Sequence, residues 1–183
     1  IDPVKGIDIL VKSFAKLQND KLKLMIIGGY NAPNPYQAKL LKLAKSLNLE
    51  ENIHFVGAIP HGDLVKYYNS SDLIVIPSLY ESFGLVSLEA FATEKPVIAS
   101  NVGGLASTII NEVNGILFEP GDVEDLTKKI NLLLSNQSLS EQIARQAFLD
   151  VSKYSWDTAT SQVFKVYESL LSVSNKIQRA SSY

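Results

Sequence analysis

The sequence of 183 residues has no cysteine, and this absence removes several kinds of site together. Disulfides, thiolate zinc sites and cysteine nucleophiles are all excluded. Two histidines, His54 and His61, are too few for most metal cages. No apolar run reaches the roughly 20 residues that a helix needs to span a bilayer, and no secretory leader is visible. We therefore expect a cytoplasmic protein, whose contact with a membrane, if any, would come from parts outside this sequence.

An excess of basic charge is also missing. Seventeen lysines and arginines stand against nineteen aspartates and glutamates, so the net charge is -2. Proteins that bind nucleic acid carry a clustered basic excess, and we therefore expect no nucleic acid among the partners. The shares of hydrophobic residues (46%) and charged residues (20%) are ordinary for a globular protein. The length suits one well-cored domain.

Apolar runs of strand length alternate with longer helical patterns along most of the chain. The stretch "IDILVKSFAKL" (residues 7–17) repeats its apolar residues at the spacing of one helix face. By contrast, "LKLMIIGG" is a short, nearly all-apolar run that suits a strand buried on both faces. Five strands are predicted in this way, at about Leu22–Ile27, Ile53–Val56, Leu73–Ile76, Pro96–Ala99 and Gly115–Phe118.

Strand-helix-strand repeats with short connections predict an α/β fold, a Rossmann-like parallel sheet with helices on both faces. The stretch "IDPVKG" is typical of a strand-to-helix connection, yet no strand precedes it. Either the first strand of the sheet lies upstream, or the domain begins with a loop. We favour the missing strand, because a parallel sheet gains little from an unpaired interior edge. The C-terminal part predicts two successive helices with a break near Tyr154–Trp156.

The stretch "ESFGLVSLE" (residues 81–89) follows the third predicted strand and leads into a helix. Ligands of open parallel sheets bind at the carboxyl ends of the strands, so a site is expected here. We expect Ser82 to be the N-cap of this helix. The first amides of the helix, which lack intrahelical partners, would then be those of Phe83, Gly84 and Leu85. Such a helix start favours anions, and phosphate is the natural occupant.

Two carboxylates flank this anion site, with seven residues between them. Glu81 stands in the loop, and Glu89 lies roughly 7–8 Å further along the helix axis by the helical rise. That is too far for two carboxylates that share a proton, and it favours two acceptors for two sets of hydroxyls on one elongated ligand, a nucleotide sugar. A capped helix with one solvated glutamate is the alternative. Against it, Glu89 lies on an otherwise apolar face, where an unpartnered carboxylate is costly.

Other residues are expected near the same edge of the sheet. Lys5, before the first helix, could complement a diphosphate as a point charge. We predict that His61 is a loop residue near the base or ribose, whereas His54 alternates within a strand and is expected to be packed. Glycines at strand exits either let the main chain approach a ligand or make tight turns. The residues predicted to share the carboxyl edge are Gly29, Ile59, Glu81 and Gly103.

Four stretches together resemble a known family. They are "DPVKG", "IIGG", "VGAIPHGDLVKYYNSSDLIVIPSLYESFGLVSLEAFATEKPVIASNVGG" and "NGILFEPGDVEDL". From Ile1 to about Tyr167 the sequence is similar to the donor-binding, C-terminal half of family 4 retaining glycosyltransferases of the GT-B fold. Sucrose-phosphate synthases and relatives of glycogen synthase look similar. The two glutamates with seven residues between them, followed by "KPVIASNVGG", make the resemblance specific.

The resemblance implies a role for each residue of the site. Glu89 would hold the ribose hydroxyls, Glu81 would lie beside the transferred sugar, and Lys5 would contact the diphosphate. The reaction would transfer a hexosyl group with retention at the anomeric carbon. The first candidate is a glucosyl group from UDP-glucose, and no metal or cofactor would be required. The other donor-binding positions would be Gly29 at the cleft floor, Ile59 at the base, and Ser82, Phe83, Gly84 and Leu85 at the sugar and diphosphate.

The sequence also departs from the family in two ways. The arginine that joins the lysine at the phosphates would lie just before Ile1, and the acceptor-binding domain is not in this sequence. We therefore expect residues 1–152 to form the donor-binding domain and residues 153–183 to form a helix that crosses toward the missing N-terminal domain. The chain alone should be inactive. The alternatives are a non-catalytic nucleotide-binding module and a GT-B sugar-nucleotide epimerase or phosphorylase.

Overall fold

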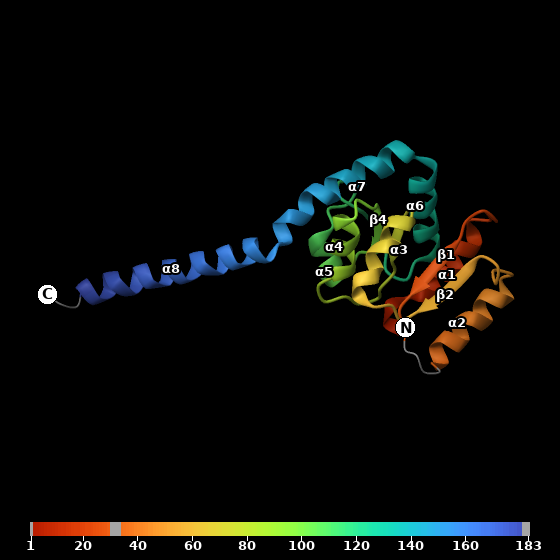
Figure 1. Cartoon of the computed structure of the whole chain (residues 1–183), viewed down its shortest axis with the longest axis horizontal. Coiled ribbons are helices and arrows are strands. Elements are labelled where there is room, and N and C mark those ends of the chain that lie inside the picture. Colours follow the sequence, from red (N-terminus) through yellow and green to blue (C-terminus); the bar gives the residue numbers. More distant parts are fainter. Residues whose placement is uncertain (1, 30–33, 181–183) are drawn as a thin grey trace.

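The computed structural model describes residues 2–29 and 34–180 (Figure 1). Helices and strands alternate as the sequence predicts. The strands are β1 (Leu24–Ile27), β2 (Ile53–Gly57), β3 (Ile74–Ile76), β4 (Val97–Ser100) and β5 (Ile116–Phe118). The helices are α1 (Ile7–Lys16), α2 (Pro35–Ser46), α3 (Leu64–Ser70), α4 (Leu85–Ala92), α5 (Gly103–Thr108), α6 (Val123–Ser135), α7 (Gln137–Val151) and α8 (Trp156–Ala180).

All five predicted strands are confirmed, with ends that differ by no more than two residues from the expected ones. Every pairing is parallel, as predicted: β1 pairs with β2, and β4 pairs with both β3 and β5. Hydrogen bonds divide the strands into two groups, β1-β2 and β3-β4-β5. Among the described residues β1 and β3 therefore each have one strand neighbour, where a single continuous sheet was expected.

Strand β4 shows why these runs are apolar at every position. Its four residues are all fully buried, since helices cover both faces of the sheet. Ile98 packs with α1 and α6 on one face, and Val97 and Ala99 pack with α4 and α5 on the other. Burying one large apolar side chain in such a core contributes about 1.5–3 kcal/mol to stability. Strands β1 and β2 have their own core against α1 and α2, centred on Val11, Ile26 and Ile53.

The parallel direction of the strands brings the predicted edge residues to one side. Gly29, Ile59, Glu81 and Gly103 each follow the carboxyl end of a strand, β1, β2, β3 and β4 respectively. The prediction that they share the carboxyl edge is therefore confirmed. Several elements that flank this edge are short, so its geometry depends on contacts between loops.

The C-terminal part has the predicted break. Helix α7 ends at Val151, a 3-10 turn covers Ser152–Tyr154, and α8 begins at Trp156. In Figure 1, α8 extends away from the rest of the molecule. Its described apolar side chains are exposed, among them Val163, Val166, Tyr167 and Leu170. In the part of the chain that the structure describes, no helix is both long and apolar enough to cross a membrane.

Candidate functional site

Lys5 and Glu81, 76 residues apart in the sequence, form an ion pair at the carboxyl edge. The Lys5 ammonium donates to Glu81 Oε2 at 2.7 Å. The Glu81 side chain is only 16% exposed, whereas that of Lys5 is 47% exposed. The cation therefore faces solvent while the carboxylate lies deeper. The sequence placed these residues at two separate recognisable positions, and the structure brings them into one site.

Backbone contacts hold the segment that carries Lys5. The amide of Leu79, after β3, donates to the Val4 carbonyl at 2.8 Å. Gly6 has a φ of 61°, and a Cβ there would stand 2.0 Å from the Pro77 carbonyl oxygen. Only glycine fits both the left-handed conformation and this contact. The turn before α1 is thus fixed directly on the exit of β3, and Lys5 is fixed beside Glu81.

The loop of Glu81 rests on a second glycine contact. Gly104 donates its amide to the Glu81 carbonyl at 2.9 Å. A Cβ on Gly104 would lie 2.4 Å from the Phe83 Cα and 2.5 Å from the Ser82 carbonyl oxygen. These glycines were expected to serve a ligand or a tight turn. In the structure Gly103 and Gly104 let the start of α5 lie against the loop of residues 81–83.

The start of α4 corrects one prediction. Ser82 is not the N-cap: Gly84 holds that position, with a φ of 83°, and the helix begins at Leu85. The reason is tertiary, since a Cβ on Gly84 would lie 2.7 Å from Leu105 Cδ2. Phe83 and Gly84 precede the helix, so the amides of its first turn begin with Leu85. In this turn the amide of Ser87 donates to the Gly84 carbonyl at 2.9 Å, so the helix start offers a ligand the amides of Leu85 and Val86.

Glu89 is held by two side chains that sequence reasoning did not connect to it. Tyr68, on α3, donates its hydroxyl to Glu89 Oε2 at 2.7 Å. His61 Nε2 lies 3.0 Å from Glu89 Oε1. A carboxylate has about four acceptor positions, so each oxygen keeps capacity for one more donor. Glu89 is thus oriented and remains able to accept hydroxyls from a ligand.

Tyr68 acts as a permanent donor to Glu89. Burial and the hydrogen bond to Glu89 raise the pKa of Tyr68 well above its usual value, so the hydroxyl keeps its proton. His61 lies in the loop after β2, as predicted, and its ring is mostly exposed. His54 corrects the other histidine prediction. It is exposed rather than packed, because it lines a cavity beside β1.

Several large apolar side chains close to Glu81 in the sequence are exposed. They lie in the loop after β3 and in the first turn of α4, and they are Leu79, Tyr80, Phe83, Leu85 and Val86. Among the described residues no group of three or more acidic or histidine side chains could hold a metal ion.

Comparison with known proteins identifies the family. Residues 1–150 match the family model described as glycosyl transferases group 1. The chain belongs to this family. An uncharacterized glycosyltransferase of Methanocaldococcus jannaschii is 36% identical over 165 residues, 90% of this chain and 42% of that protein. A D-inositol 3-phosphate glycosyltransferase of Salinispora arenicola is 31% identical over 174 residues, 91% of this chain and 39% of that protein. The chain spans less than half the length of these relatives.

Solved structures agree with this assignment. A sucrose-phosphate synthase from Thermosynechococcus elongatus matches with a TM-score of 0.81 and 32% identity, over 94% of this chain and 44% of that one. The Anabaena protein Alr3699/HepE, in complex with UDP-glucose, matches with a TM-score of 0.82 and 26% identity, over 92% of this chain and 46% of that one. These neighbours are GT-B glycosyltransferases, and this group 1 chain has the Rossmann-like fold of about half of such an enzyme.

Proposed function

We propose that this chain is the nucleotide-sugar-binding half of a retaining glycosyltransferase that transfers a hexosyl group to an acceptor. The donor is a UDP-sugar, with UDP-glucose first among the candidates. The observation that carries the proposal is the position of Lys5, Glu81 and Glu89 at one carboxyl edge of a group 1 glycosyltransferase domain. Solved neighbours that contain UDP and UDP-glucose support the choice of donor.

The diphosphate of the donor would lie between Lys5 and the start of α4. The Lys5 ammonium is half exposed and held in place by Glu81, so it can reach a phosphate without losing its partner. The first amides of α4 and the partial positive charge of the helix start supply further donors. Together they provide cationic stabilisation of the leaving group, and no metal or cofactor is assigned.

The two carboxylates would bind different ends of the donor. Glu89, fixed by Tyr68 and His61, accepts the ribose hydroxyls, and the backbone near Ile59 lies on the base. Glu81 lies beside the transferred sugar. Gly29, Ser82, Phe83, Gly84 and Leu85 line the path between these ends.

In the reaction, the bond between the anomeric carbon and the phosphate oxygen breaks, and a bond to the acceptor oxygen forms on the same face. The acceptor proton passes to the departing diphosphate, so charge and atoms balance. Chain residues contribute by orientation and by electrostatic stabilisation of the diphosphate. The acceptor would be held by the rest of a longer protein, toward which α8 and the exposed apolar residues of the edge would face. In this division residues 1–152 bind the donor and residues 153–183 form the crossing segment.

Titration calorimetry with UDP and UDP-glucose tests the division of the two carboxylates. Glu89→Ala should weaken the binding of both ligands roughly tenfold to a hundredfold, since charge-assisted hydrogen bonds are worth about 1.5–3 kcal/mol. Glu81→Ala should leave UDP binding unchanged and weaken UDP-glucose alone. Equal losses for both ligands in both variants would contradict the proposal.

A non-catalytic nucleotide-binding module and a GT-B epimerase or phosphorylase are the competing functions. The presence of both Glu81 and Glu89 favours the transferase, because a module that binds only a nucleotide does not need the carboxylate at the sugar. A screen of nucleotide sugars with a form of the protein that includes the acceptor half distinguishes these functions by product. The transferase alone gives a glycosylated acceptor and a free nucleoside diphosphate.

A further inference from the structure

In the free chain both oxygens of Glu89 have a partner, and the two partners differ in exposure. Tyr68 is half-buried and donates its hydroxyl to Oε2 at 2.7 Å, whereas His61 Nε2 lies 3.0 Å from Oε1. The His61 side chain is 83% exposed, and that of Glu89 is 29% exposed. Oε1 is therefore the oxygen whose partner stands in solvent.

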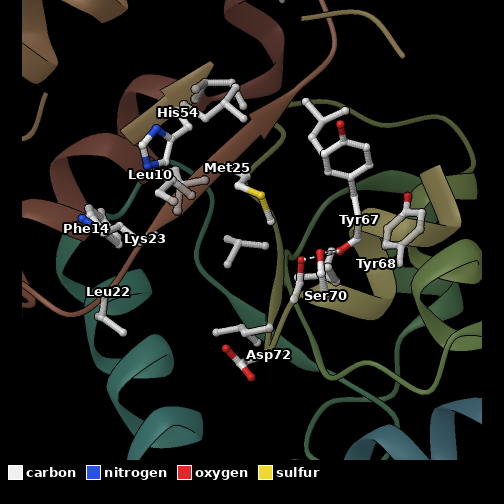
Figure 2. A pocket seen from close by; sticks show the side chains of 18 of the residues that line it. Leu10, Phe14, Leu22, Lys23, Met25, His54, Tyr67, Tyr68, Ser70 and Asp72 are labelled. Atoms are coloured by element: carbon white, nitrogen blue, oxygen red, sulfur yellow. Dashed lines mark hydrogen bonds between the residues drawn. The ribbon is translucent and has the colours of Figure 1, made fainter. Parts of the chain in front are cut away.

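A cavity shows from which directions the two partners reach Glu89. Its volume is about 760 Å³, both β1 and β3 line it, and Glu89 and Tyr68 belong to its wall. Figure 2 shows Tyr67 and Tyr68 of α3 on one side of this cavity. Among the described residues that line the cavity His61 is absent. Tyr68 thus reaches Glu89 from the cavity, and His61 reaches it from the outer surface.

The charged groups near His61 leave its ring to Glu89. His61 opens the short 3-10 turn between β2 and α3. Asp63, the carboxylate of this turn, pairs with Lys66 of α3 at 2.7 Å. The Tyr68 hydroxyl is bound to the other oxygen of Glu89. Among the described residues Glu89 is therefore the charged group that the His61 ring contacts.

The strength of this contact depends on the charge of the ring. Histidine changes its charge roughly between pH 5 and 8. When the His61 ring is protonated, its contact with Glu89 is an ion pair with a charge-assisted hydrogen bond, which is about twice as strong as a neutral one. When the ring is neutral, an ordinary hydrogen bond remains. The hold of His61 on Oε1 therefore weakens as the pH rises.

A ribose would need the oxygen that His61 holds. Its two neighbouring hydroxyls are both donors, and a carboxylate binds a pair of donors best when each oxygen accepts one. The His61 ring stands on the solvent side of Oε1, from which a ligand arrives. An exposed side chain in a short turn loses few contacts when it moves. His61 is thus the partner of Glu89 that gives way, and Tyr68 is the partner that stays.

We propose that His61 makes an autoinhibitory, proton-dependent contact: its ring takes the place of a ribose hydroxyl on Glu89 Oε1 and has to leave before a nucleotide sugar binds. Protonation of His61 therefore lowers the affinity for the donor, and by linkage the donor promotes release of that proton. The inference rests on the proposed function, in which Glu89 accepts the ribose hydroxyls.

Titration calorimetry with UDP-glucose at about pH 5.5 and about pH 8 tests the inference. UDP-glucose is the probe because it lacks the terminal phosphate group of UDP, which takes up a proton in this range. The variant His61→Gln keeps a hydrogen-bond donor but takes up no proton. His54→Gln is the matched control, since His54 of β2 is the other of the two histidines in the sequence.

The unmodified chain should bind UDP-glucose about three- to fivefold more weakly at the lower pH, because an exposed ion pair has to be broken there. His54→Gln should show the same difference, whereas the two affinities of His61→Gln should agree within about 1.5-fold. An undiminished difference in His61→Gln would overturn the inference. Tighter binding at the lower pH would overturn it too, since the charged ring would then attract the diphosphate instead of competing for Glu89.

The variant Glu89→Gln separates this inference from the proposed function. It should weaken binding at both pH values and remove the pH difference, because a neutral amide forms no ion pair. Unchanged affinity in Glu89→Gln would contradict the ribose contact itself, and the inference with it. A clear loss there, together with a pH difference that persists in His61→Gln, would overturn the inference alone.

NMR signals of the histidine rings extend the test to weak binding, at millimolar UDP-glucose. The signals of His61 should move on addition of the ligand, and those of His54 should not. If the His61 signals stay in place, the inference fails.

Discussion

Glu89 takes its two partners from elements that are distant in the sequence, Tyr68 at 21 residues and His61 at 28 residues. Their roles differ in kind. The raised pKa of Tyr68 makes its hydroxyl a donor at every physiological pH, whereas the mostly exposed His61 can turn away when a ligand arrives. We therefore assign the orientation of Glu89 to Tyr68. Neither contact could be found from the sequence, because only the fold brings α3 and the loop after β2 to α4.

Replacing Tyr68 by phenylalanine should weaken UDP binding by roughly three- to tenfold, because one hydrogen bond to a charged group is lost while the ring remains. If Tyr68 acts by orienting Glu89, the variant should also differ in how strongly it recognises the ribose 2′-hydroxyl. The penalty for 2′-deoxy-UDP relative to UDP should shrink in Tyr68→Phe, since a loosely held Glu89 gains less from the 2′-hydroxyl. Calorimetry with both nucleotides measures this difference.

Tyr67→Phe, at the neighbouring position of α3, is the matched control, and both affinities should stay within about twofold of the unmodified chain. If Tyr68→Phe lowered the two affinities by the same factor, Tyr68 would act on overall stability of the site and not through Glu89.

At the scale of elements, the strands were predictable and the start of α4 was not. Each strand is a short apolar run, and burial on both faces demands such a run whatever its neighbours are. The N-cap of α4 depends instead on a contact between Gly84 and Leu105 of α5, which are 21 residues apart. Local preference favoured Ser82, and tertiary packing selected Gly84. The same kind of contact, through Gly6 and Gly104, positions both halves of the site.

Helix α7 is tied to the loop before β5 by one buried carboxylate. Asp150 accepts from Lys153 at 2.6 Å and from the buried Asn114 at 3.0 Å, and Asn114 in turn accepts from the amide of Ile110. The hydrogen bond from Lys153 lowers the pKa of Asp150; burial acts in the opposite direction, and the bond from Asn114 adds to the lowering. The net pKa of Asp150 lies below its usual value.

This lowered pKa predicts how stability responds to acid. The unfolded chain takes up the proton first, near the ordinary aspartate pKa of about 3.9, so the contribution of Asp150 is complete above that pH. It is lost as pH falls through the lower pKa of the folded state. Asp150→Asn should therefore reduce the free energy of unfolding by about 1–3 kcal/mol at pH 7 and by clearly less near pH 3.

Denaturant unfolding at the two pH values measures this, with Glu141→Gln on the exposed face of α7 as control. The control should stay within about 0.5 kcal/mol at pH 7. A loss in Asp150→Asn that is the same at both pH values would mean that packing, and not the charge of Asp150, makes the contribution.

At the scale of the whole molecule, three features face outward that an enzyme would need to cover. They are the Lys5 side chain of the ion pair with Glu81, the exposed apolar side chains of residues 79–86, and α8 with its exposed apolar residues. The sequence predicted α8 as the second of two C-terminal helices, because helical spacing is a local property. From the sequence we noted only that no strand precedes residues 1–6. The gap between β1 and β3 could not be placed, because its position within the sheet depends on the order of the strands.

The isolated chain should bind UDP and yet transfer no sugar. In the proposed function, binding would use Glu89, Lys5 and the start of α4, which are all within this chain, whereas transfer would require an acceptor held against the open edge and water excluded from it. Release of UDP from UDP-glucose is measured with and without acceptors, inositol 3-phosphate among them because relatives are named for it. No acceptor should raise the rate above that of buffer. Release that depends on an acceptor, and that disappears in Lys5→Ala, would show instead that the donor half is an enzyme by itself.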